Sequence, residues 1–173
     1  KVNSYVTPVK DKLNVIYEDD YILAVVKDRG VLTHSSRYND NISLEALVLG
    51  YYSPLPFTFR AVNRLDKDTS GIVLIAKDML TASFLGNQMK RGEMIKEYYA
   101  LCTYEPKDKE FIVEGNIRRE SESSVKRIMA TDGEYSKTKF EYVKRCKNGL
   151  YLLKARLFTG KTHQIRVHLA SIN

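Results

Sequence analysis

Between residues 95 and 158 the chain contains five consecutive stretches with the composition of β-strands. In the clearest of them, SKTKFEYV, the apolar Phe140 and Tyr142 alternate with the charged Lys139 and Glu141. Successive side chains of a strand point to opposite faces, so this period of two predicts one buried and one solvated face. Such strands are typical of antiparallel sheets. The other four stretches are IKEYYALCTY, EFIVEGNI, SVKRIMA and GLYLLKARLF.

The remaining elements are predicted from apolar spacing and turn residues. GIVLIAKD, residues 71–78, is a continuous apolar run, which favours a strand buried on both faces. MLTASFLGNQMKRG has apolar residues four apart and predicts a helix over 79–92 that ends at Gly92. We also expect strands over 14–17 and 21–27, a helix over 43–52 with Ser43 as its N-cap, a loop over 53–59 and a helix over 162–172.

Length and composition fit one globular domain, or one large domain with a small appendage. The chain has 173 residues, of which 43% are hydrophobic and 28% charged, so it can bury a sizeable core. We expect a polar lead-in segment over residues 1–12 and one folded domain over residues 13–173. The expected fold class is α+β, mainly antiparallel, with a few flanking helices.

The charge balance favours an acidic partner. The chain carries 28 Lys and Arg against 21 Asp and Glu, a net charge of +7. Nucleic acid is the commonest partner of such a protein, although a generic basic surface gives the same count. The lysines are spread along the chain, which suits a basic face of a folded surface better than a disordered tail.

The sequence predicts a cytoplasmic protein. Cys102 and Cys146 lie outside any Cys-x-x-Cys pattern, as expected for free thiols in a reducing compartment. No apolar stretch is long enough to span a membrane, and the first residues do not resemble a signal peptide.

The segment FRAVNRLDKDTSGIVLIAKD, residues 59–78, places Arg64 and Asp66 immediately before the expected buried strand. A carboxylate at a strand end is held rigidly, and a nearby guanidinium keeps it ionised. An ionised, oriented Asp66 can serve as a nucleophile or a base. The alternative is an ordinary acidic turn in which Asp66 and Asp68 pair with Arg64 or Lys67 in solvent.

A second polar cluster lies in TGKTHQIRVHLA, residues 159–170. Gly160 permits an unusual backbone turn, and Thr162 is the expected N-cap of the last helix. Lys161 and the first-turn amides would favour an anion there. Because His163 and His168 are five residues apart, they point to opposite sides of a helix, so we expect no metal site. A polar face on an amphipathic helix is the plainer interpretation.

The segment KEYYALC contains two adjacent tyrosines, Tyr98 and Tyr99. In a strand they point to opposite faces. We expect one to lie in the core, while the other is free to line a cleft and stack on a base.

Taken together and in this order, the segments resemble the RluA-type pseudouridine synthase family. NRLDKDTSGIVLIAKD resembles the family's motif of His-Arg-Leu-Asp followed by Thr-Ser-Gly. KEYYALC is similar to its Lys-x-Tyr-x-Ala strand, and TGKTHQIRVHLA to its Thr-Gly-Arg-Thr-His-Gln-Ile-Arg-x-His segment. VIYEDDYILAVVKDRGVLTHSS resembles the opening strands, so the resemblance covers nearly the whole chain. It implies a mainly antiparallel sheet of the pseudouridine synthase type.

The resemblance implies an isomerase that converts specific uridines of ribosomal or transfer RNA to pseudouridine. Asp66 would be the catalytic carboxylate, acting as a nucleophile or as a base. Arg64 would hold the nucleotide outside the stack, and Tyr98 would stack on the target uracil. Arg166 would pair with the Asp, while Tyr99 would face away toward packing. A glycoside hydrolase would instead need a second acid about 5–9 Å from Asp66.

The same resemblance implies an RNA partner, no cofactor and no metal, and a monomer is the default expectation. The residues expected to bind RNA are Arg64, Lys161, His163 and Gln164, and the catalytic residues are Asp66, Tyr98 and Arg166. The alternative function is a catalytically inactive RNA-binding module on the same fold.

The chain departs from the family pattern at three places. Asn63 stands where His is usual, and Lys27-Asp28-Arg29-Gly30 lacks the proline of Lys-Pro-x-Gly. The family's catalytic domain also continues with further strands beyond the position of Asn173. We therefore expect residues 13–173 to be a catalytic domain whose C-terminal part is missing.

Overall fold

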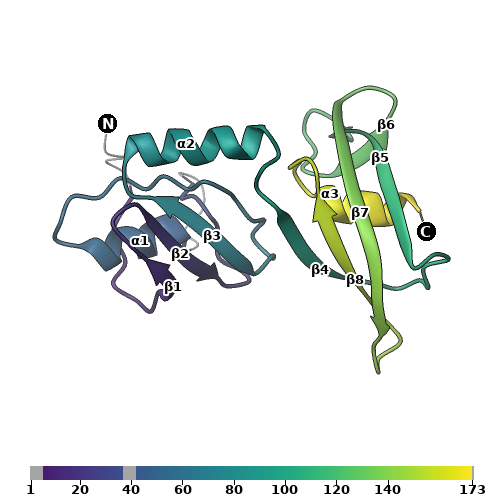
Figure 1. Cartoon of the computed structure of the whole chain (residues 1–173), viewed down its shortest axis with the longest axis horizontal. Helices are drawn as coiled ribbons and strands as arrows, with labels where there is room; N and C mark the ends of the chain where they lie inside the picture. Colours follow the sequence, from purple (N-terminus) through teal and green to yellow (C-terminus); the bar gives the residue numbers. More distant parts are fainter. Residues whose placement is uncertain (1–5, 37–41, 173) are drawn as a thin grey trace. The chain divides into compact units, whose positions relative to one another are not determined.

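The computed structural model describes residues 6–36 and 42–172, and the chain divides into two compact units at residues 90 and 91 (Figure 1). Both units combine antiparallel sheets with helices, which confirms the α+β fold class. Residues 6–12 contain no helix or strand. The assignment of residues 13–173 to one catalytic domain stays a prediction.

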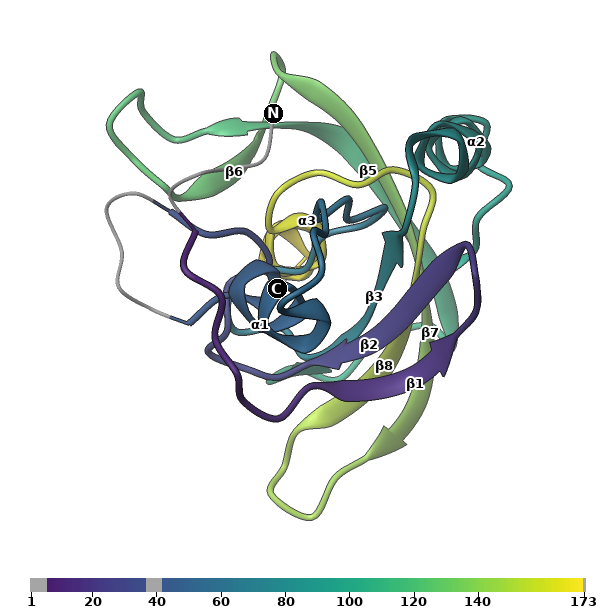
Figure 2. The ribbon, with the colours of Figure 1, turned by 90° about the vertical axis from the view of Figure 1, so that its left-hand side faces the viewer.

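The first unit is built on a three-stranded antiparallel sheet in the order β1 (Asn14–Glu18), β2 (Ile22–Lys27), β3 (Gly71–Ala76). Helix α1 (Leu44–Tyr52) lies against one face of the sheet (Figure 2), and α2 (Met79–Lys90) contacts β3. The core is apolar and fully buried, and its central residues are Leu23, Val25, Val48, Val73 and Ile75.

The ends of the two helices follow the sequence signals. The Ser43 side chain accepts a hydrogen bond from the Ala46 N–H at 3.1 Å and so caps α1 as predicted. Gly92 adopts φ +72° just beyond α2, which confirms it as the stop signal. Within α2, Leu85 and Met89 are half-buried.

Strand β3 differs from the prediction that both of its faces are buried. Val73 and Ile75 are fully buried on one face, but Ile72 on the other is 54% exposed. The physical reason is that this face of the strand is only partly covered, since Leu74, which shares the face with Ile72, is also only half-buried.

The second unit is a five-stranded antiparallel sheet with helix α3 (Gln164–Ser171) against one face (Figure 1). The strand order is β4 (Lys96–Cys102), β8 (Tyr151–Leu157), β7 (Glu134–Arg145), β5 (Glu110–Arg119), β6 (Arg127–Ala130). The core between sheet and helix contains Cys102, Val113, Phe140, Tyr151, Leu153, Ala155 and Leu169.

The alternation predicted for the 135–145 strand is confirmed in β7. Phe140 is fully buried against the core, whereas Lys139 lies on the opposite face. There its Nζ is 2.7 Å from Glu110 Oε2. A second salt bridge on this face joins Lys154 to Glu97 at 3.0 Å, so the face carries paired charges.

Candidate active site

Asp66 follows a segment that is fixed along the free edge of β3. The Val62 N–H donates to the Leu74 carbonyl at 2.7 Å, and the Ala76 N–H donates to the Arg60 carbonyl at 2.9 Å. These bonds satisfy part of the edge of β3, where unpaired backbone groups would otherwise face solvent. The backbone is therefore held in register with β3 up to four residues before Asp66.

Asn63 extends this pairing with its side chain. Its Nδ2 donates to the Ile72 carbonyl at 3.0 Å, and its Oδ1 accepts from the Leu74 N–H at 2.8 Å. A side-chain amide carries a donor and an acceptor on adjacent atoms, so it can pair with a strand as a backbone amide does. This gives Asn63, which departs from the family motif, a physical role in anchoring the loop.

Leu65, next to the predicted catalytic residue, is fixed by Thr33. The Leu65 N–H donates to Thr33 Oγ1 at 3.2 Å, and Thr33 Oγ1 donates to the Leu65 carbonyl at 2.9 Å. Both residues are buried. After Leu65 the chain turns, with the Thr69 N–H donating to the Asp66 carbonyl at 3.0 Å.

Beneath this turn lies Lys27, the last residue of β2, which is only 1% exposed. Its Nζ donates to the backbone carbonyl oxygens of Asp28 at 2.9 Å, Val31 at 2.7 Å and Lys67 at 3.1 Å. Burial lowers the pKa of the Lys27 amine, and the negative charges of Asp66, Asp68 and Asp28 oppose that shift. The buried Lys27 amine therefore lies against the acidic turn, Asp66–Asp68.

The Asp66 loop thus combines a half-buried Asp66 with Arg64 and Asp68, whose side chains are exposed. Sequence reasoning missed Lys27 and Thr33 as parts of this loop. The signal for Lys27 was a lysine at the end of an apolar strand, where its amine must find buried acceptors. Thr33 gave no such signal, because its contacts lie 32 residues away in the chain.

In the second unit, the prediction that Tyr99 of β4 faces packing is wrong. Tyr98 is half-buried and packs against the core of the second sheet. Tyr99 is 71% exposed, so it does not face packing. The reason is the register of β4, in which Tyr98 shares a face with Ala100 and Cys102, the core side of the strand.

Gln164 organises the loop before α3. Its Oε1 accepts from Thr159 Oγ1 at 2.7 Å and from the Lys161 N–H at 2.9 Å. Its Nε2 donates to the Lys137 carbonyl at 3.0 Å and to Thr138 Oγ1 at 2.9 Å. The side chain is 3% exposed, so these contacts position the loop from within, and contact of Gln164 with RNA stays a prediction.

The start of α3 differs from the prediction that Thr162 is its N-cap. The helix begins at Gln164, and the capping position is His163, whose side chain makes no capping hydrogen bond. The residue with a positive φ in this loop is His163, at 58°, rather than Gly160. A left-handed conformation is costly for a residue with a Cβ, and the contacts of Gln164 hold the loop in it.

His168 continues the buried polar network on the inner face of α3. Ser136 Oγ donates to the Gly115 carbonyl at 2.7 Å, so it accepts from His168 Nε2 at 2.8 Å. His168 Nδ1 then accepts from Thr138 Oγ1 at 2.9 Å, and burial lowers the pKa of the imidazole. Gln164 and His168, four residues apart on α3, thus share a buried face.

The predicted site residues are divided between the two units. Arg64 and Asp66 belong to the first, whereas Tyr98, Lys161, His163, Gln164 and Arg166 belong to the second. Arg166 is exposed on α3, and Lys161 Nζ is 2.8 Å from Glu134 Oε1. The pairing of Arg166 with Asp66 stays a prediction.

Neither a metal cluster nor a membrane span is found in the described part of the chain. Over residues 6–36 and 42–172, no three His, Cys, Asp or Glu side chains gather as metal ligands would. Within the same residues, none of the helices has the length and apolar content needed to cross a bilayer.

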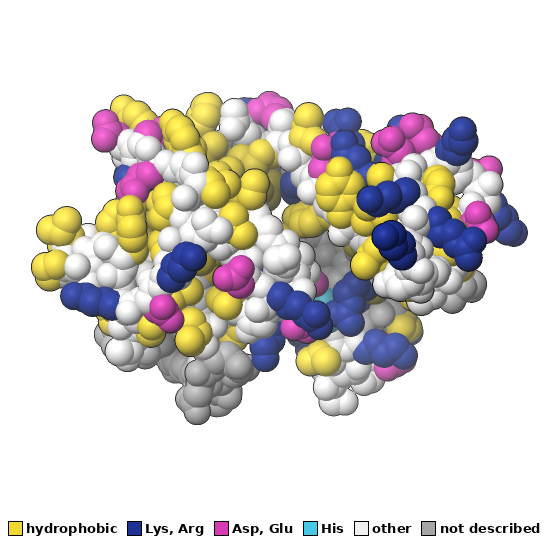
Figure 3. Space-filling model, turned by 90° about the horizontal axis from the view of Figure 1, so that it is seen from below, with side chains coloured by type: hydrophobic (Ala, Val, Ile, Leu, Met, Phe, Trp, Pro, Cys, Tyr) yellow, Lys and Arg dark blue, Asp and Glu magenta, His cyan; other side chains and the backbone are white. Residues whose placement is uncertain are grey.

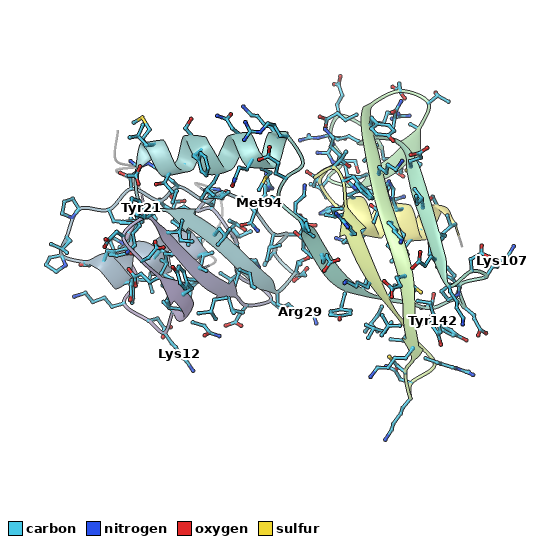
Figure 4. The ribbon with its side chains drawn as sticks, viewed as in Figure 1. Lys12, Tyr21, Arg29, Met94, Lys107 and Tyr142 are labelled. Carbon is cyan, nitrogen blue, oxygen red and sulfur yellow. The ribbon has the colours of Figure 1, made fainter. Side chains whose placement is uncertain are left out.

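The positive charge is concentrated in the second unit. Residues 91–173 hold 17 Lys and Arg against 11 Asp and Glu, a net charge of +6, while residues 1–90 carry +1. Figure 3 shows Lys and Arg side chains gathered on the right-hand part of one face, where this unit lies. Single basic side chains also project from both units, for example Lys12 and Lys107 (Figure 4).

A family model described as RNA pseudouridylate synthase matches residues 21–171, which cover most of both units. The chain is 31% identical over 172 residues to the uncharacterized RNA pseudouridine synthase YhcT of Bacillus subtilis, covering 98% of this chain and 57% of the relative. It is 33% identical over 156 residues to ribosomal large subunit pseudouridine synthase C of Rickettsia prowazekii, covering 89% and 51%. The chain thus spans about half the length of these curated relatives.

The fold is also that of solved pseudouridylate synthase domains. Human RNA pseudouridylate synthase domain containing 1 aligns with a TM-score of 0.79 at 20% identity, covering 93% of this chain and 65% of that one. The human domain containing 4 protein aligns with a TM-score of 0.73 at 18% identity, covering 91% and 64%. The agreement of fold, motif order and family match shows that the chain belongs to the RNA pseudouridylate synthase family.

Proposed function

We propose that the full-length protein isomerises uridine in RNA to pseudouridine, with Asp66 as the catalytic carboxylate. In this reaction the bond between ribose C1′ and uracil N1 breaks, and a bond between C1′ and uracil C5 forms. The C5 proton leaves to solvent, and N1 gains a proton. No atom is added to the nucleotide, so the enzyme needs one well-placed carboxylate and a pocket that retains the detached base.

The observation that carries the proposal is the way the Asp66 loop is fixed. Asn63 and Thr33 hold the residues before Asp66, and the Lys27 amine holds the turn after it. A carboxylate on such a backbone is aimed with little freedom, as catalytic groups require. An ordinary solvent-exposed acidic turn would not need a buried cation and two side-chain anchors.

Tyr98 and Arg166 are proposed to act in the same reaction, Tyr98 by stacking on the target uracil. Stacking and pocket contacts would offset the few kcal/mol that extruding a base costs. Arg64, Lys161, His163 and Gln164 are proposed as RNA-binding residues, through direct contact or through the loop that Gln164 organises. The family resemblance supports these roles, together with the charge of the second unit.

We infer ribosomal RNA as the first substrate to test, with transfer RNA as the second. The name of the Rickettsia relative refers to the large ribosomal subunit, which favours the first. The protein is proposed to act as a cytoplasmic monomer, without a cofactor.

The alternative is an RNA-binding module on the same fold that has lost catalysis. It predicts RNA binding without chemistry. The presence of Asp66, Tyr98 and Arg166 together favours the enzyme, because a module that only binds RNA has no need for the carboxylate.

RNA labelled with tritium on uracil C5 distinguishes the two. We expect the protein to release the label to water as pseudouridine forms. Asp66→Asn keeps the shape of the side chain and removes its charge, so release should fall at least about a hundredfold. RNA binding by this variant should stay within a few-fold of the parent.

Asp68→Asn is the matched control, because it removes an exposed carboxylate from the same turn. It should release label at nearly the parental rate. Equal release by Asp66→Asn and the parent would refute the assignment of Asp66, and binding without any release by the parent would favour the inactive module.

A further inference from the structure

In the hairpin formed by β5 and β6, two arginines lie opposite each other at the end that is closed by the connecting loop, residues 120–126. Arg119 of β5 lies directly across from Arg127 of β6 in the strand register. Like charges at such positions destabilise a hairpin, since their side chains stand close together on one face. A pair of this kind is stabilised when an anion lies between or over the two guanidinium groups.

Neighbouring basic residues of the same hairpin are neutralised within the chain, and these two are not. Lys126 Nζ is 2.6 Å from Glu120 Oε1. By contrast, neither Arg119 nor Arg127 forms an ion pair with an acidic side chain of residues 6–36 or 42–172. Arg127 Nε is buried without a hydrogen-bond partner in that part of the chain. Arg119 Nη1 donates to the Glu122 carbonyl at 3.4 Å, and because a guanidinium carries five N–H groups, each arginine keeps donors that this part of the chain does not use.

The two arginines lie on the same face of the sheet as α3. Ile117, two residues before Arg119, is buried on that face, and side chains two apart in a strand share a face. Glu134 of β7 lies across from Ile117 and is bridged to Lys161 in the loop before α3. The positive charge of Arg127 also acts on the Glu134 carboxyl, and together with Lys161 it lowers the pKa of that group.

Arg119, Arg127 and Lys161 therefore form one basic surface, called here the hairpin surface, that leads from the hairpin to the start of α3. It includes the acid Glu134 and lies in the unit that carries a net charge of +6. The same unit carries Tyr98 and Arg166, which are proposed to act on the target nucleotide.

We propose that the hairpin surface binds backbone phosphates of the RNA substrate next to the modified uridine. Two arginines with free donors suit successive phosphates of a strand, because each guanidinium can hold a phosphate through two hydrogen bonds. The surface supplies affinity and leaves the chemical step to Asp66. The inference rests on the proposed function, since it takes the RNA substrate as the partner.

The test is the salt dependence of RNA binding by the full-length protein, with a synthetic stem-loop that carries uridine in its loop. Each lost phosphate contact lowers the slope of log K against log salt by about 0.7, so Arg119→Gln/Arg127→Gln should lower it by about 1.4. At moderate salt the affinity should fall about tenfold or more. Label release at saturating RNA should stay near the parental value.

Two control variants make the result specific. Lys139→Gln/Lys154→Gln removes two positive charges from the opposite face of the same sheet, where both are paired with glutamates. It should leave the slope nearly unchanged. Arg119→Lys/Arg127→Lys keeps both charges and should retain most of the slope, which separates a lost contact from a misfolded hairpin.

The proposal would be overturned if the slope of log K against log salt were the same for Arg119→Gln/Arg127→Gln as for the parent. It would also be overturned if Lys139→Gln/Lys154→Gln lowered the slope by as much as Arg119→Gln/Arg127→Gln. Binding of an acidic peptide in place of RNA by the hairpin surface would also overturn it. If the double Gln variant loses slope as predicted but the parent releases no label, the proposed chemistry fails and the hairpin surface stands.

Discussion

At the scale of single residues, Lys27 and Asn63 account for the rigidity of the Asp66 loop. Lys27 donates to three carbonyls, one of them in the turn that follows Asp66. Asn63 pairs with β3 through its amide. A buried carbonyl that loses its donor costs free energy of folding, so these hydrogen bonds both stabilise the loop and fix its backbone conformation.

Lys27→Met tests the buried amine at this scale. Methionine has a similar length but offers no donor, so the carbonyls of Asp28, Val31 and Lys67 lose a partner. We expect the free energy of unfolding in urea to fall by about 1–3 kcal/mol. Label release by the folded variant should also fall, because the cation that acts on Asp66 is gone.

Lys67→Met is the control for that change, because its side chain is exposed on the same turn and only its carbonyl takes part in the network. It should unfold within about 0.5 kcal/mol of the parent. A Lys27→Met variant as stable and as active as the parent would show that the buried amine does not support the loop.

Residue contacts of this kind were only partly readable from sequence. Motif order identified Asp66, Tyr98 and Arg166 as candidates, since these positions resemble a family pattern. The roles of Lys27 and Thr33 in this loop were missed, because their partners in it, the Lys67 carbonyl and Leu65, lie 40 and 32 residues away and depend on how the chain folds back. Asn63 could be explained only once its two partners in β3 were known.

At the scale of elements, local pattern predicted most of the helices and strands. Alternation fixed the buried face of β7, and Ser43 and Gly92 marked helix ends. The predictions failed where neighbours decide the outcome, as in the exposed face of β3. The start of α3 was also missed, because contacts of Gln164 with β7 hold His163 in a left-handed conformation.

Two glycines in helix interiors give a matched prediction about elements. A Cβ on Gly50 of α1 would lie 2.0 Å from the Val9 carbonyl oxygen, because the segment before β1 crosses α1 there. Gly50→Ala should therefore lower the free energy of unfolding by about 1–3 kcal/mol. Gly86 of α2 has open space at that position, so Gly86→Ala should raise stability by about 0.5–1 kcal/mol.

Thermal or urea unfolding of both variants checks this pair. The opposite signs matter more than the sizes, since both substitutions add one methyl group to a helix. Equal effects would mean that the segment around Val9 does not pack on α1 as described.

At the scale of the whole molecule, the two units differ in what they carry. The unit of residues 1–90 holds Asp66 and is nearly neutral, whereas the unit of residues 91–173 holds most of the net positive charge. The family match spans residues 21–171 and so covers most of both. We infer that the second unit supplies most of the RNA affinity and the first supplies the carboxylate.

Nucleoside analysis of a uridine-containing RNA tests the central claim most directly. The RNA is incubated with the full-length protein and digested completely, and its nucleosides are then separated by chromatography and identified by mass spectrometry. We predict that uridine is lost and an equal amount of pseudouridine of the same mass appears, and that Asp66→Asn forms none. Free uracil in place of pseudouridine, or pseudouridine formed equally by Asp66→Asn, would contradict the account.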